Sequence, residues 1–88
     1  MKIVDGFVVC TVGEKTVAVA SGELSKKFNG MITLNPTGEE LFRMLQKGTD
    51  LEEMTAALES KYGVPKETAE RDVNAFLSGI RKAGLLVD

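Results

Sequence analysis

The side chains able to do chemistry are few and lie far apart along the chain. There is one cysteine, Cys10, and no histidine. A thiol nucleophile usually needs a neighbouring base such as histidine to activate it. Without histidine, the common zinc-binding combinations also lack their ligands. No phosphate-binding loop or acid–base pair stands out, so we expect no catalytic residue, no metal site and no cofactor.

Cys10 falls in a β-rich stretch, on the same side as Val8 and Val12. Free cysteine is among the most buried residue types and behaves there as a small apolar side chain. We therefore expect Cys10 to be buried and without a role in binding or catalysis.

A strip of small side chains marks the longest expected helix, which covers residues 65–83. Ala75, Gly79 and Ala83 recur every four residues and share one face, with Asp72 one turn earlier. Glycine inside a helix costs about 1 kcal/mol relative to alanine, so Gly79 calls for an explanation. Two interpretations stay open: a strand of this chain approaches Gly79 closely, or the strip floors a groove for another polypeptide.

The same helix carries an apolar stripe at helical spacing, formed by Ala69, Val73, Phe76, Leu77 and Ile80. We expect this stripe, including Phe76, to face the core. Pro65 suits the first turn, and Gly84 suits the position after the last.

The elements that position this helix precede it in the sequence. Residues 7–12 and 16–20 are expected to form a hairpin around a turn at 13–15. A polar connection over residues 21–30 leads to a short third strand formed by Met31, Ile32, Thr33 and Leu34. We expect this strand at a sheet edge, where unpaired N–H and C=O groups must be covered or used.

Two helices follow, before the long one. Asn35 and Pro36 predict the start of the first, and Gly48 predicts its end. Thr49 to Glu52 reads as a capping box that opens the second, which Gly63 closes. The expected fold class is α+β and winged-helix-like: an N-terminal three-stranded antiparallel β-sheet followed by a three-helix bundle. The length of 88 residues predicts one domain over residues 1–88.

The composition bears on which partners the protein binds and in which cell compartment it works. The net charge is −2, which argues against nucleic acid, because affinity for phosphates comes from clustered Lys and Arg. No apolar stretch approaches the ~20 residues of a membrane span, and the first residues do not resemble a signal peptide. An unpaired cysteine suits a reducing compartment, so we expect a cytoplasmic protein.

Residues 31–87 resemble the PqqD family, which supplies recognition elements for ribosomally made, post-translationally modified peptides. The features that carry the resemblance are Leu34-Asn35, the Gly48 stop, the start of the second helix from Thr49 to Met54, Tyr62, the D-V-x-x-F-L run from Asp72 to Leu77, and Gly84-Leu85-Leu86. Their order and spacing together are more specific than any one of them alone.

The resemblance implies a non-catalytic peptide chaperone. In the family, the leader of a precursor peptide adds as a strand to the sheet edge, between the third strand and the third helix. The module then presents the peptide to a modifying enzyme, often a radical S-adenosylmethionine enzyme. The peptide-binding residues implied here are Met31, Ile32, Thr33, Leu34, Asp72, Ala75, Gly79 and Lys82.

The pathway stays open at this point. Family members that serve pyrroloquinoline quinone synthesis usually carry an acidic or Cys-Asp type of residue before the glycine that ends the first helix. This chain has Gln46-Lys47-Gly48 there. A chaperone for another modified peptide therefore fits at least as well.

The main alternative is a winged-helix DNA-binding protein whose long helix enters the major groove. Its N-terminal part carries Glu67, Glu70 and Asp72 against Lys66 and Arg71, and the carboxylates would meet phosphates unfavourably. A gel shift with random DNA across a salt series would separate the two functions. A purely structural or oligomerisation subunit is a further alternative.

Overall fold

The computed structural model describes residues 1–28 and 30–87. Asn29, inside the predicted polar connection, and Asp88, the end of the expected domain, lie outside the described residues. The elements in chain order are β1 (Lys2–Ile3), β2 (Phe7–Val12), β3 (Lys15–Ala20), α1 (Leu24–Lys27), β4 (Met31–Leu34), α2 (Pro36–Lys47), α3 (Leu51–Tyr62), α4 (Lys66–Lys82) and β5 (Leu86–Val87).

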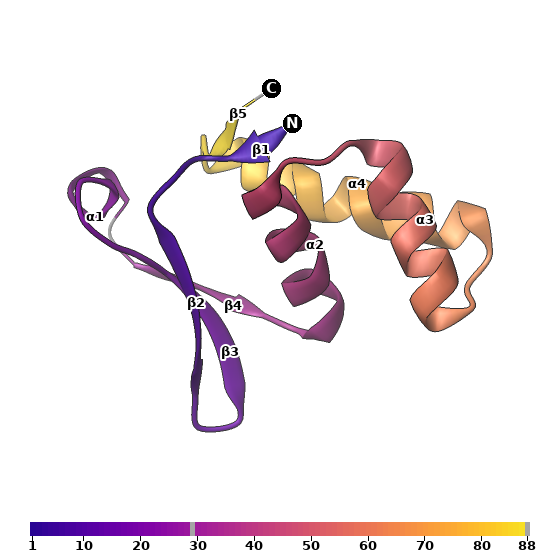
Figure 1. Ribbon diagram of the computed structural model, residues 1–88, viewed down its shortest axis with the longest axis horizontal. Helices are drawn as coiled ribbons and strands as arrows, with labels where there is room; N and C mark the ends of the chain where they lie inside the picture. The colour runs from indigo at the N-terminus through magenta and orange to yellow at the C-terminus, as the bar shows by residue number, and fades with distance from the viewer. Residues whose placement is uncertain (29, 88) are drawn as a thin grey trace.

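The predicted fold class is confirmed. Strands β2, β3 and β4 form an antiparallel sheet in that order, and α2, α3 and α4 follow it in the chain. Figure 1 shows the sheet on one side of the molecule and the three longer helices on the other. Two features were not expected: the single-turn helix α1 within the polar connection, and a small antiparallel pairing of β1 with β5. None of the helices in residues 1–28 and 30–87 combines the length and apolar character needed to cross a bilayer.

The start of α2 matches the sequence prediction, whereas the start of α3 does not. The N–H of Gly38 donates to Asn35 Oδ1 at 2.7 Å, so Asn35 caps α2. In α3 the cap is Asp50, whose Oδ1 accepts from the N–H of Glu53 at 2.7 Å. The capping box predicted from Thr49 is therefore wrong by one residue. Thr49 is buried outside the helix, where its N–H donates to the carbonyl of Met1 at 2.9 Å.

The long helix ends in a turn that returns the chain to the core. Pro65 is the residue before α4, not part of its first turn as expected. At the other end, the N–H of Leu85 donates to the Ile80 carbonyl at 3.2 Å and that of Gly84 to the Arg81 carbonyl at 2.9 Å. This is a Schellman turn, in which Gly84 adopts a φ of 73° that glycine tolerates best. Leu85 is buried as a result, and β5 reaches β1.

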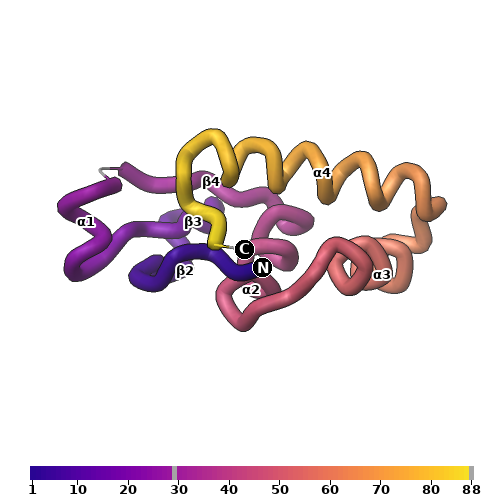
Figure 2. The backbone as a smooth tube through the Cα atoms, turned by 90° about the horizontal axis from the view of Figure 1, so that it is seen from above, coloured from indigo at the N-terminus to yellow at the C-terminus, as the bar shows by residue number. Residues whose placement is uncertain are grey.

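One cluster of buried apolar side chains joins the sheet to the helices. Its members are Ile3, Phe7, Ala18, Leu34, Leu41, Phe42, Leu45, Met54, Leu58, Ala69, Val73, Leu77, Ile80 and Leu85. Phe42 lies near its centre, with its ring edge-on to Phe7 at a centroid distance of 5.4 Å. Helix α3 packs on α4, and Lys61 of α3 reaches Glu40 of α2 at 3.0 Å. Strands β1 and β5, near the two ends of the chain, lie side by side in both overall views (Figures 1 and 2).

The outer face of the sheet is exposed along β2, which corrects the expectation for Cys10. The helices pack against the face that carries Phe7, Ala18 and Leu34. On the opposite face Val8 is 52% exposed, Val12 is 61% exposed, and Cys10 between them is exposed as well. The apolar neighbours of Cys10 suggested burial because valine usually lies in a core, but no helix in the described chain covers this face.

Candidate functional site

The strand β4 has one neighbour in the sheet. The strand order places it at an edge, beside β3 only, as the sequence predicted. Ile32 and Leu34 point toward the helices, whereas Met31 and Thr33 are exposed on the outer face. An edge strand presents a row of backbone N–H and C=O groups that another strand can pair with.

The register of the β2–β3 hairpin decides which groups of β4 are free. Gly13 and Glu14 form a two-residue turn that closes on the pair Val12–Lys15. Gly13 has a φ of 65°, as the first residue of a tight hairpin turn requires. A two-residue turn of this kind closes on a hydrogen-bonded pair, and such pairs alternate along antiparallel strands. Lys15 and Val17 of β3 therefore direct their backbone groups toward β2.

The residues of β3 between these direct their backbone groups the other way, toward β4. Ala18 is opposite Ile32 in the register, so Ile32 bonds back to β3. By the same alternation, the N–H and C=O groups of Met31 and Thr33 point to the free edge. The edge therefore offers the backbone of two residues, spaced as an incoming strand requires.

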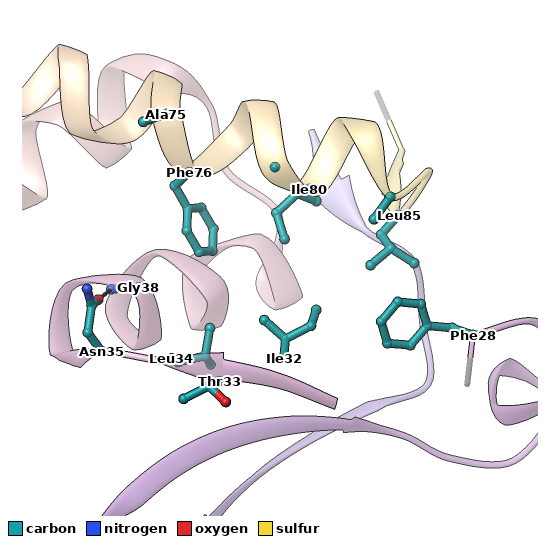
Figure 3. A pocket seen from close by; sticks show the side chains of 12 residues that line it. Phe28, Ile32, Thr33, Leu34, Asn35, Gly38, Ala75, Phe76, Ile80 and Leu85 are labelled. Carbon is teal, nitrogen blue, oxygen red and sulfur yellow. Dashed lines mark hydrogen bonds between the residues drawn. The ribbon is translucent and has the colours of Figure 1, made fainter. Parts of the chain in front are cut away.

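A groove of about 400 Å³ lies beside this edge, between β4 and the C-terminal half of α4. Figure 2 shows the two elements running alongside each other. The residues around the groove are Phe28, Ile32, Thr33, Leu34, Asn35, Gly38, Ala75, Phe76, Gly79, Ile80, Ala83 and Leu85. In Figure 3, Phe76, Ile80 and Leu85 point down into it from α4 and the turn after it, and Ile32 and Leu34 point up from β4. The walls are thus mainly apolar.

The small-residue strip of α4 lines this groove. Ala75, Gly79 and Ala83 are all among the lining residues, and all three are exposed. A Cβ atom placed on Gly79 would have no heavy atom within 4 Å from the neighbouring described elements. The interpretation in which a strand of this chain packs closely on Gly79 is therefore wrong. The face is open, as the groove interpretation requires.

Phe76 differs from the expectation for the apolar stripe. Ala69, Val73, Leu77 and Ile80 are buried as predicted, but Phe76 is only half-buried and forms part of the groove wall. Phe76 lies at one edge of the helical stripe, and this position leaves it at the margin of the core. The ring of Phe76 lies against the first turn of α2, where a Cβ on Gly38 would be 3.5 Å from it.

The residues predicted to bind peptide fall into three places. Ile32, Thr33, Leu34, Ala75 and Gly79 line the groove, and Met31 belongs to its edge strand. Asp72 lies just beyond, in a depression of about 440 Å³ that continues past Phe76. Lys82 lines a separate depression on α4 with Ser78 and Arg81, so the structure does not bring it together with the others.

Several lining residues were not predicted from the sequence. Phe28 was noted only as the one large apolar residue of the polar connection. It packs edge-on against Phe7 at a centroid distance of 5.5 Å and closes one end of the groove. Asn35 was predicted to start the first helix and Gly38 was given no role, although the turn that they form lines the other end.

Two solved structures share the fold over all or nearly all of the chain. One is described as TbiB1 in complex with the TbiA(beta) leader peptide; it has a TM-score of 0.76 and 26% identity, covering 100% of both chains. The other is described as lasso peptide synthetase B1 complexed with the leader peptide. It has a TM-score of 0.74 and 20% identity, covers 99% of this chain and 96% of that chain, and informs on the fold alone.

No curated protein sequence matches this chain, and nothing in the comparisons supports the DNA-binding alternative. The family model described as coenzyme PQQ synthesis protein D (PqqD) matches residues 13–86, which include strands β3 and β4 and the whole of α2, α3 and α4. The chain therefore belongs to the PqqD family.

Proposed function

We propose that residues 1–88 act as a single recognition domain that binds the leader segment of a ribosomally made precursor peptide. The leader adds as a strand to the free edge of β4 and lies in the groove between β4 and α4. The domain holds the peptide for a modifying enzyme, such as a radical S-adenosylmethionine enzyme, and does not itself catalyse the modification. The observation that carries this proposal is a free strand edge bordered by an open, apolar groove.

The geometry supports strand addition specifically. Backbone groups at Met31 and Thr33 supply hydrogen bonds that do not depend on peptide sequence, and these contribute affinity. Side chains of an added strand alternate between the two faces, so every second peptide residue enters the groove. The TbiB1 neighbour is a complex with a leader peptide, which supports the same class of ligand for this chain.

A proline at position 33 tests the proposal with little expected harm to the fold. The N–H of Thr33 points to the free edge, so Thr33→Pro removes no bond between β3 and β4, and proline is tolerated on edge strands in this orientation. The same change removes a donor that the incoming strand needs and places a ring on the edge. Thr33→Val, which keeps the N–H, is the matched control.

Binding peptides are selected from a displayed library of random peptides of roughly twelve residues. Peptides of this length span the four residues of β4 with overhang on both sides. Peptides enriched on the wild-type protein are then synthesised with a fluorescent label and titrated by anisotropy. We expect Thr33→Pro to weaken binding at least tenfold, or about 1.4 kcal/mol, and Thr33→Val to bind like wild type. Equal binding by a folded Thr33→Pro protein would contradict strand addition.

A further inference from the structure

The groove does not end at Phe76. The depression beyond it shares Asn35, Gly38, Ala75 and Phe76 with the groove, so the two are continuous. Its remaining lining residues are Thr37, Leu41 and Asp72. The ring of Phe76 thus divides one long channel into an apolar part and a polar part.

The two parts differ in charge as well as polarity. The lining of the apolar part contains no charged residue among those described, whereas Asp72 is the one charged residue in the lining of the polar part. The Asp72 side chain is 49% exposed, and its nearest cation is Arg71 Nε at 3.8 Å, a loose contact between sequence neighbours. The carboxylate therefore remains available to a second cation.

The start of α2 also lies here, and a helix N-terminus would favour an anion. Two features weaken that effect at this helix. Pro36 has no N–H, and the N–H of Gly38 is already bonded to Asn35 Oδ1 at 2.7 Å. The full charge of Asp72 then outweighs the remaining partial charge, so the polar part favours a cation.

Strand register links the two parts. A peptide residue opposite Ile32 directs its side chain into the apolar part, beside Ile80 and Phe76. The next side chain on the same face is two residues along the peptide, about 7 Å away, opposite Leu34. From there a long side chain extends past Phe76 toward Asp72.

We propose that the polar part, centred on Asp72 and Thr37, is a second subsite that takes a lysine or arginine side chain. This basic residue lies two positions from an apolar residue that fills the groove. The inference rests on the proposed function, because it assigns a sequence preference to a peptide bound as a strand on β4.

The random-peptide library tests this directly. Peptides enriched on the wild-type protein should carry Lys or Arg two positions from an apolar residue. Selection on Asp72→Asn should lose that preference, and selection on Asp72→Lys should replace it with Asp or Glu. Glu70→Gln removes one negative charge from the same helix at a site that faces α3, and it should keep the wild-type preference.

A pair of synthetic peptides measures how much the basic residue contributes to affinity. Replacing the basic residue of a selected peptide by glutamine should weaken binding to the wild type about two- to fivefold, as expected for a partly exposed ion pair, and should not affect Asp72→Asn. The difference should shrink at high salt. A peptide pool with no basic position, or a basic preference retained by Asp72→Asn, overturns this inference alone. A failure to enrich any peptide on the wild type overturns the proposed function and this inference with it.

Discussion

Replacing Gly79 by leucine should raise stability while it blocks the groove. Gly79 is exposed on α4, and a Cβ atom added there would have no heavy atom of a neighbouring described element within 4 Å. Leucine is a better helix former than glycine by roughly 0.6–0.8 kcal/mol. For a domain of this size, a gain of about 1 kcal/mol raises the melting temperature by about 4–8 °C. We therefore expect Gly79→Leu to melt about 3–6 °C above the wild type.

The same substitution should weaken peptide binding. The leucine side chain would project into a groove of about 400 Å³, in the space that the inward-facing side chains of the peptide would occupy. We expect the Kd for a peptide selected on the wild type to rise at least tenfold, a loss of about 1.4 kcal/mol. Thermal melts followed by circular dichroism and anisotropy titrations measure the two effects on the same samples.

Two matched variants separate blocking from other effects of the mutation. Gly79→Ala gives a similar gain in helix propensity but adds only a methyl group, so it should melt higher and bind nearly as well as wild type. Ser78→Leu adds an exposed leucine on a different face of α4, outside the groove, and should keep binding. A Gly79→Leu protein that is stable and binds with unchanged affinity would refute the groove assignment. A Gly79→Leu protein less stable than the wild type would show that this face of α4 is not open.

Three further substitutions test other parts of the account. Phe76→Ala should weaken peptide binding in titrations but cost roughly 1–2 kcal/mol of stability, because this side chain is only half-buried; a loss as large as the ~3–5 kcal/mol expected for fully buried Phe42 would return Phe76 to the core. Asp50→Ala should lower the free energy of unfolding in urea by about 1 kcal/mol, because α3 loses its cap, and Thr49→Val should leave that cap in place. If Thr49→Val removed the cap and Asp50→Ala did not, the capping box predicted at Thr49 would be correct. Cys10→Ser should leave both melting temperature and affinity nearly unchanged, since Cys10 is exposed and away from the groove; loss of binding by a folded protein would assign it a role.

Local signals in the sequence predicted the elements that frame the site. Asn35-Pro36 and Gly48 act within one turn of the helix they bound, so α2 has the predicted limits. The alternation and short length of residues 31–34 likewise predicted β4 and its edge position. The recurrence of Ala75, Gly79 and Ala83 identified the strip that lines the groove.

The features that the sequence did not predict depend on which surfaces pack together in the fold. Cys10 and Val12 look like core residues until the helices are seen to pack only on the other face of the sheet. Phe76 fits the helical spacing of the stripe, yet in the fold it is only half-buried and forms part of the groove wall. The caps of α3 at Thr49 and Asp50 are equally plausible by local pattern, and the contact of Thr49 with Met1, 48 residues away, decides between them.

The most direct test of strand addition is amide hydrogen exchange along β4, measured by NMR with and without a saturating peptide selected on the wild type. Ile32 and Leu34 already bond to β3, whereas the N–H groups of Met31 and Thr33 point to the free edge. We expect bound peptide to slow exchange strongly at Met31 and Thr33, with much smaller changes at Ile32 and Leu34. Unchanged exchange at Met31 and Thr33 under saturating peptide would show that the ligand binds without pairing to β4 and would contradict the central claim.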